Sequence, residues 1–158
     1  MLKIFNLFVV SNAFKLLTNY TPPNQLLLRP CSQINPVILE TTYHVCTALR
    51  KTGVVDCEVS ELGNVNVCSA PNGHYGTFYP NTKEIWLNDL LIHFKKLIFN
   101  IILHEIVHAL GLDHSKEIGI MSYSVRQDSY GITLEDSTEL WPSIDDFRGL
   151  LYIKYMNL

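Results

Sequence analysis

The sequence predicts a single α+β domain, in which short β-strands precede a long apolar helix and a final C-terminal helix. Three observations predict this class. Short β-rich runs lie between residues 26 and 88, an apolar helical stretch covers Leu90–Gly111, and a second helical pattern covers Ser143–Tyr155. A chain of 158 residues is long enough to bury a substantial core as one domain.

The N-terminal stretch Met1–Ala13 has two interpretations that its residues leave open. It contains a lysine, a short apolar run, and the small residues Ser11 and Ala13 ahead of a potential cut, a pattern typical of a short signal peptide. An N-terminal strand explains the same residues equally well. Under both interpretations we expect residues 14–158 to form one domain.

Two elements open this domain. Leu26–Leu28 predicts a strand after the turn at Pro22 and Pro23. Asn35–Thr52 predicts a helix, because Asn35 can cap its first turn, proline is tolerated at the next position, and a glycine follows its end. The buried face of this helix is expected to contain Ile38, Val45 and Leu49.

Further β-rich runs precede the long apolar helix. Val54–Leu62 and Val65–Val67 predict two short strands. Gly76–Pro80 and Glu84–Asn88 lie on either side of a polar Asn-Thr-Lys segment, so together they predict a β-hairpin.

The long helix carries the main chemical signal, the sequence HEIVHALGLDH at His104–His114. In a helix, His104 and His108 lie one turn apart on the same face and can bind one Zn²⁺ together. Glu105 lies beside them, where a general base for a zinc-activated water is expected. Gly111 can adopt the left-handed conformation that ends a helix, and the chain can then return His114 as the third ligand.

The H-E-x-x-H-x-x-G-x-x-H pattern is specific, because every fixed position matches. Its chance expectation in a chain of this composition is roughly 10⁻⁵. Three protein ligands leave a fourth coordination position open, which is typical of a catalytic rather than a structural zinc site. The alternative is a buried helix with incidental histidines, whose polar groups would then lack partners.

This pattern resembles the zinc-binding motif of the metzincin metallopeptidases, and His114-Ser115 resembles their matrixin (matrix metalloproteinase) branch. The resemblance implies the metzincin fold, with a twisted mixed β-sheet, an active-site helix and a C-terminal helix. In this fold a methionine turn lies beneath one catalytic zinc, and Met121 fits that turn. It also implies a zinc-dependent endopeptidase with Glu105 as general base. The alternative function is a catalytically silent zinc-binding decoy or inhibitor on the same scaffold.

Tyr123 resembles a different branch of the family. Met121-Ser122-Tyr123 is similar to the turn of astacins and serralysins, whose tyrosine can approach the zinc. The resemblance implies a catalytic role in which the Tyr123 hydroxyl donates a hydrogen bond to the oxyanion of the transition state. The alternative is a tyrosine that only fills space beneath the turn.

The predicted hairpin resembles two neighbouring metzincin strands, one of which is an exposed edge. This implies that an extended peptide or protein substrate binds along Gly76–Pro80, whereas the alternative is an ordinary hairpin without a ligand. Matrixins hold a second zinc with histidines whose positions fall here at Gly76 and Trp86. Since neither residue binds metals, we expect one zinc only, and we expect His74 to be a solvated loop residue.

The final helix is predicted from Ser143 to Tyr155. Ser143 and Asp146 have the spacing of a capping box, and the buried face is expected to contain Ile144, Phe147 and Leu151. Residues 143–146 resemble the matrixin C-terminal helix, in which paired acids anchor the methionine turn. The alternative is that Asp145 and Asp146 only complement the helix dipole.

The composition of the chain bears on the cellular compartment of the protein and on the partners that it can bind. The four cysteines (Cys31, Cys46, Cys57 and Cys68) suit two disulfides of a secreted protein, with three pairings open, and the alternative is four reduced thiols in a cytoplasmic protein. A net charge of −3 without a basic stripe argues against nucleic acid binding. No apolar run is long enough to span a membrane, and we expect a monomer.

Overall fold

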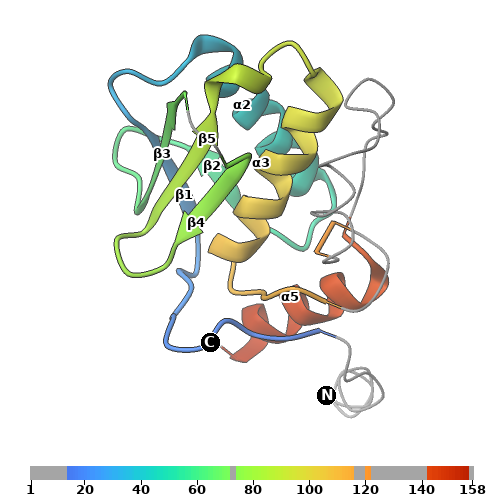
Figure 1. The fold of residues 1–158 in the computed structure, drawn as a ribbon. Coiled ribbons are helices and arrows are strands. Elements are labelled where there is room, and N and C mark those ends of the chain that lie inside the picture. Colours follow the sequence, from blue (N-terminus) through green and yellow to red (C-terminus); the bar gives the residue numbers. More distant parts are fainter. Residues whose placement is uncertain (1–13, 72–73, 116–119, 122–141, 157–158) are drawn as a thin grey trace.

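The computed structural model describes residues 14–71, 74–115, 120–121 and 142–156 (Figure 1). The predicted signal peptide or N-terminal strand at Met1–Ala13 lies outside these residues. The described elements are β1 (Leu26–Pro30), α2 (Pro36–Lys51), β2 (Cys57–Val59), β3 (Val65–Ala70), β4 (Gly76–Tyr79), β5 (Glu84–Asn88), the 3₁₀ turn η1 (Asp89–Leu91), α3 (Lys95–Ala109) and α5 (Ile144–Met156). The fold is therefore α+β, as the sequence predicts at this level.

The sheet is mostly parallel and ends in one antiparallel edge strand. Its five strands have the order β2-β1-β3-β5-β4. β1 pairs in parallel with β2 and β3, and β3 pairs in parallel with β5. β4 runs antiparallel to β5, with Phe78 opposite Ile85, which confirms the predicted hairpin. Among the described strands, β4 has β5 as its one neighbour, so its outer side is an edge of the described sheet.

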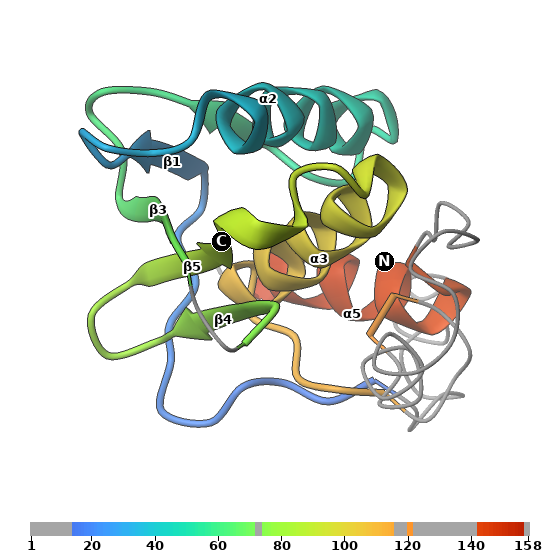
Figure 2. The same ribbon diagram turned by 45° about the horizontal axis from the view of Figure 1, so that its top comes forward.

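Helices α2 and α3 lie on the same face of the sheet (Figure 2). α2 packs against β2 and α3, while α3 packs against β4 and β5. The core lies between these two layers and includes the fully buried side chains of Leu26, Leu28, Ile85, Ile98 and Ile102. α5 lies below the end of α3 in Figure 1, on a separate lower level of the molecule.

Helix α2 begins and ends as the sequence predicts. The side chain of Asn35 accepts a hydrogen bond of 2.9 Å from the N–H of Val37, and Pro36 occupies the first turn. Gly53, beyond the C-terminal end, has a φ of +74°, which suits glycine. The predicted buried face is confirmed, since Ile38, Val45 and Leu49 are all 0 % exposed.

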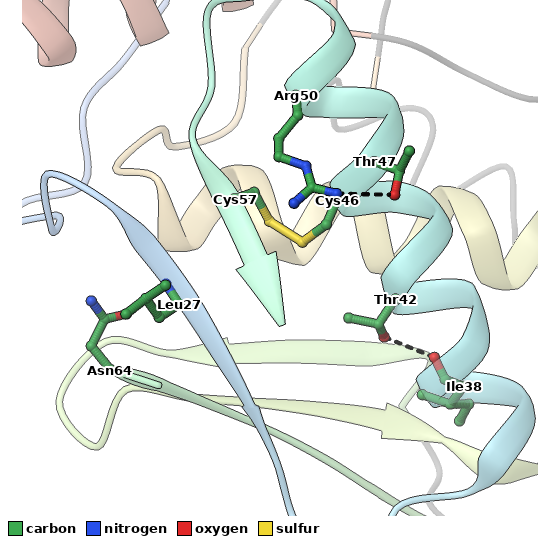
Figure 3. Close-up of a disulfide and its surroundings, with 8 residues drawn as sticks. All are labelled: Leu27, Ile38, Thr42, Cys46, Thr47, Arg50, Cys57 and Asn64. Atoms are coloured by element: carbon green, nitrogen blue, oxygen red, sulfur yellow. Dashed lines mark hydrogen bonds between the residues drawn. A yellow bond between two sulfur atoms is a disulfide. The ribbon is translucent and has the colours of Figure 1, made fainter. Parts of the chain in front are cut away.

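Two disulfides use all four cysteines. One bond joins Cys46 of α2 to Cys57 at the start of β2 (Figure 3). The other joins Cys31, just after β1, to Cys68 of β3. The alternative of four reduced thiols is therefore wrong for this structure, and the pairing is typical of a protein in an oxidising environment. Within the described residues, no helix has the length and apolar character needed to cross a membrane.

The long helix starts later than predicted. The expected start was Leu90, but α3 begins at Lys95. The side chain of Asn88 accepts a hydrogen bond of 2.9 Å from the N–H of Leu90 and so begins the separate turn η1. Phe94 then has non-helical backbone angles of φ −100° and ψ 76°. The predicted strand at Val54–Leu62 is also too long, because only Cys57–Val59 pairs with β1.

The buried face of α5 differs from the prediction. Ile144 is 74 % exposed and Phe147 is only partly buried. The buried residues are instead Asp145, Asp146, Gly149 and Leu150. The helix turns its acidic first turn inward because Ser143 and Asp146 form the predicted capping box, with hydrogen bonds of 2.8 and 3.1 Å.

Candidate metal centre

Helix α3 holds two histidine rings side by side. Nε2 of His104 lies 3.1 Å from Nε2 of His108, one helical turn later. Both side chains are buried, and nearly every residue from Leu97 to Ala109 is buried with them. The two rings therefore project from a rigid helix at the centre of the protein.

After the C-terminal end of α3, the chain reverses direction and brings a third histidine close to these two rings. The N–H of Gly111 donates to the carbonyl of His108 (2.9 Å), and the N–H of Leu112 donates to the carbonyl of Val107 (3.3 Å). This is a Schellman motif, and Gly111 at φ +111° has the positive φ that it needs. As a result, Nε2 of His114 lies 3.2 Å from Nε2 of His104. The three predicted histidines come together, with their ligand atoms within 4.8 Å of one another.

Backbone carbonyl groups fix the protonation of two of these rings. Nδ1 of His104 lies 2.6 Å from the carbonyl oxygen of Ile120, and Nδ1 of His108 lies 2.7 Å from that of Leu112. A carbonyl oxygen can only accept a hydrogen bond, so each Nδ1 carries the proton. In the neutral rings each Nε2 therefore presents a lone pair, which is the arrangement that orients imidazole as a metal ligand.

The donor set fits a divalent metal ion. Two lone pairs facing each other at about 3.1 Å repel unless a cation lies between them. Nitrogen ligands at about 2.0–2.1 Å from a tetrahedral ion lie about 3.3 Å from one another. The distances of 3.1 and 3.2 Å between the Nε2 atoms are close to this value. Imidazole binds zinc, copper, iron and nickel, so the geometry supports a metal site without selecting its metal.

The side chain of Glu105, a residue of α3, lies against the edge strand β4. It is 3 % exposed. A Cβ atom placed on Gly76 would lie 3.2 Å from Cγ of Glu105 and 2.6 Å from Cγ2 of Ile101. The backbone of β4 at Gly76 therefore passes directly against the stem of Glu105, next to the first histidine.

The turn at Ile120 and Met121 joins the lower part of the protein to the metal ligands. Both residues are fully buried. The carbonyl of Ile120 contacts His104, and the carbonyl of Met121 accepts a hydrogen bond of 2.8 Å from the N–H of Ser115, next to His114. The turn thus contacts both segments that carry the histidines.

Asp146 of α5 lies beside the same turn. Burial raises the pKa of its carboxyl group, and the charge of Asp145 raises it further, whereas hydrogen bonds from Ser143 and the backbone of Met121 lower it. Within the described residues, Oδ1 of Asp146 has no partner at normal hydrogen-bond distance. The effect of the Met121 backbone on this carboxyl group shows that Asp146 lies close to the turn, as the prediction of an anchoring acid in the last helix requires.

The outcome for the other residues considered in the sequence differs from one to the next. Tyr123 lies outside the described residues. Gly76 has no side chain, and the indole N–H of Trp86 donates to Glu84. His74 is exposed, as predicted. Within the described part of the chain, the three histidines are the one group of His, Cys, Asp and Glu residues arranged to hold a metal ion.

Sequence reasoning missed three contributors to the site. The carbonyl groups of Ile120 and Leu112 orient the histidine rings, but a backbone group has no signature in the sequence. Tyr20 donates a hydrogen bond from its hydroxyl to the carbonyl of Ala109 at the end of α3, and burial raises its pKa to about 12. A tyrosine 89 positions before its partner gives no local pattern to recognise.

The fold and the site define an α+β domain with a buried three-histidine centre able to hold a metal ion. No protein-family model matches the chain, and no curated protein matches it.

Proposed function

We propose that the chain is a zinc-dependent metalloendopeptidase with a metzincin domain of the matrixin type. The observation that carries the proposal is the convergence of His104, His108 and His114, with Glu105 adjoining the first ligand on the same buried helix. All of these residues belong to the H-E-x-x-H-x-x-G-x-x-H pattern, so sequence and geometry support the same chemistry.

The architecture supports the metzincin assignment. The resemblance implies a twisted sheet with an exposed edge strand, an active-site helix, a methionine turn and a final helix. The described residues contain a sheet ending in β4, the buried helix α3, a buried turn at Met121, and α5 beside that turn. This arrangement supports the proposal.

The three histidines would hold one zinc ion through Nε2. When bound, zinc supplies a Lewis acid that polarises the scissile carbonyl and lowers the pKa of a water toward about 7. The carboxylate of Glu105 accepts the proton of the attacking water and delivers it to the leaving amine. The carbonyl groups of Ile120 and Leu112 hold the rings of His104 and His108 in the tautomer that leaves Nε2 free of a proton.

The substrate would be an extended peptide that adds to the sheet beside β4. The outer side of β4 is an edge, whose N–H and C=O groups can pair with a peptide backbone. Gly76 brings this edge into contact with Glu105. A peptide bound along Gly76–Pro80 would therefore lie next to the general base, and Tyr123 would donate a hydrogen bond to the developing oxyanion.

The two disulfides support secretion of the enzyme. Alkylation of the purified native protein should show no free thiol, whereas alkylation after reduction should label all four cysteines. Labelling of the native protein from its natural source would instead favour the cytoplasmic alternative.

The decisive experiment measures zinc content and cleavage of a quenched peptide library by the disulfide-intact chain. Glu105→Gln should retain zinc and lose about 10²–10⁴-fold in kcat, because the proton acceptor is gone. Glu84→Gln is the matched control on β5, and it should retain full activity. Near-full activity of Glu105→Gln would contradict the mechanism. Zinc binding by the wild type without any cleavage would favour the decoy or inhibitor function.

A further inference from the structure

The segment from Phe14 to Pro22, here termed the strap, runs along the turn that carries the third histidine. The strap and the turn are more than ninety positions apart in sequence but pair through their backbones. The pairing consists of an antiparallel bridge between Leu16 and Leu112, a hydrogen bond of 2.9 Å from Leu17 N–H to Gly111 C=O, and one of 2.8 Å from Asp113 N–H to Lys15 C=O. These bonds cover the turn residues just before His114.

Tyr20, near the C-terminal end of the strap, makes further contacts with α3 and β4. Its hydroxyl donates to the carbonyl of Ala109, one of the last carbonyls of α3, which lack a partner within the helix. Its ring packs edge-on against Phe78 of β4, with centroids 5.3 Å apart. Pro22 then lies against Gly111, where a Cβ atom would approach its Cγ to 3.0 Å. The strap therefore contacts both the C-terminal end of α3 and the turn at Gly111.

The strap is also anchored below, on α5. The ring of Phe14 lies 5.9 Å from that of Tyr152. Phe14 also packs on Gly149, where a Cβ atom would come within 3.1 Å of its Cγ. Figure 1 shows this blue segment crossing α5, below the orange segment that follows α3. The strap is thus held by the lower helix on one side and holds the metal-site turn on the other.

The turn before His114 depends on Gly111, so contacts that limit its conformational freedom matter for the metal site. Gly111 permits the positive φ that returns His114, but glycine also has the largest conformational freedom of any residue. If the turn were unsupported, metal binding would have to order residues Gly111–His114. The loss of their conformational entropy would then lower the affinity for the metal. Backbone pairing with the strap orders the same residues before the metal arrives.

We propose that the strap is a positioning element of the metal centre. It holds the turn in the conformation that places His114 as third ligand before the metal binds. The proposal rests on the metal site of the proposed function and not on peptidase activity. Coupling of this kind is reciprocal: a strap that strengthens metal binding is itself held more firmly when the metal is bound. Both directions can be measured.

The first test measures Zn²⁺ affinity of the full chain by competition with a chromophoric chelator. Tyr20→Phe removes the hydroxyl and keeps the ring packed on Phe78, and it should weaken Zn²⁺ binding by about 2- to 10-fold, the range for one hydrogen bond. Leu17→Pro, which removes the N–H bonded to Gly111, should weaken it similarly. Thr42→Val is the matched control, since it removes a side-chain hydrogen bond to a helix carbonyl in α2, and it should leave the affinity unchanged.

The second test measures tryptic cleavage after Lys15, which is exposed within the strap. Saturating Zn²⁺ should slow this cleavage at least several-fold more than cleavage after the exposed Lys83 at the β4–β5 turn. In His114→Ala, Zn²⁺ should no longer protect the Lys15 site selectively. This second readout does not depend on whether a strap variant lowers overall stability.

The outcomes separate the strap from the proposed function. Wild-type Zn²⁺ binding that is lost in His104→Ala supports the metal site. If Tyr20→Phe, Leu17→Pro and Thr42→Val then share the wild-type affinity, or if Zn²⁺ protects Lys15 and Lys83 equally, the strap proposal is overturned alone. Absence of Zn²⁺ binding by the folded wild type would overturn both.

Discussion

Gly76 lies in direct contact with Glu105, so that a Cβ atom at position 76 would come within 3.2 Å of the Glu105 Cγ. The contact joins the edge strand β4 to the proposed general base without any intervening side chain. The base and the proposed peptide-binding edge therefore keep a fixed relation, because both elements belong to the packed core.

Gly76→Ala should lower activity while leaving the metal in place. The new methyl group would meet Ile101 at 2.6 Å and Glu105 at 3.2 Å, so the carboxylate and the strand must separate. We expect kcat to fall about 10²-fold, as for a misplacement of about 1 Å, and stability to fall by about 1–3 kcal/mol. Thr77→Ala, which changes the other face of β4, is the control. Unaltered kcat in Gly76→Ala would show that the contact does not position the base.

The protein should bind one zinc ion per chain. If the resemblance to matrixins holds, the positions of a second zinc site fall at Gly76 and Trp86, which do not bind metals, and the described residues contain one group able to hold a metal ion. His104→Ala should remove the ion and lower the Tm, because metal binding stabilises the folded state. Elemental analysis before and after the substitution checks this. Two tightly held zinc ions in the wild type would contradict the assignment.

Tyr123→Phe should reduce kcat by about 10²–10³-fold, the cost of losing one oxyanion donor. KM should change little, since the hydrogen bond forms mainly in the transition state. Zinc content and circular dichroism should match the wild type. A Tyr123→Phe enzyme with wild-type kcat would show that the tyrosine only fills space.

The stability contribution of Asp146 should decrease as the pH rises. Burial raises the pKa of its carboxyl group in the folded protein, whereas the unfolded value is about 3.9. Between these two values the folded protein retains the proton that the unfolded chain has lost, so the free energy of unfolding falls with increasing pH. The contribution is fully present below the unfolded value of about 3.9.

Asp146→Asn removes this titration and keeps an acceptor for Ser143. Urea denaturation of both proteins with EDTA, between pH 4 and 7, isolates the effect because the other titrating groups are common to both. The wild type should lose stability relative to the Asn variant as the pH increases. The opposite slope would mean that the contacts from Ser143 and Met121 outweigh burial.

Several parts of the molecule follow from local sequence signals. Asn35 and Gly53 bound α2, because capping and positive φ are properties of single residues. The spacing of His104 and His108 places them together on any helix, with a distance of 3.1 Å between their Nε2 atoms. The hairpin at β4 and β5 also forms where its residues predict it.

The apolar pattern gave the wrong prediction at two places, and in both the deciding contact is made by a polar side chain two or three residues away. Leu90 has helical neighbours in sequence, but the side chain of Asn88 starts a separate turn there. Ile144 has the spacing of a core residue, but it is exposed because the capped acidic turn of α5 faces inward. In both cases, a polar contact outweighed the apolar pattern.

The sequence by itself determined the three histidine donors of the centre, because His104 and His108 have the spacing of one helical turn and Gly111 permits the turn that returns His114. Only the tertiary structure decided the cysteine pairing, the tautomers of His104 and His108, the contact of Gly76 with Glu105, and the pairing of the strap with Gly111. Backbone N–H and C=O groups are present in every residue, and four cysteines allow three pairings, so the partner of each group is selected only when the chain packs.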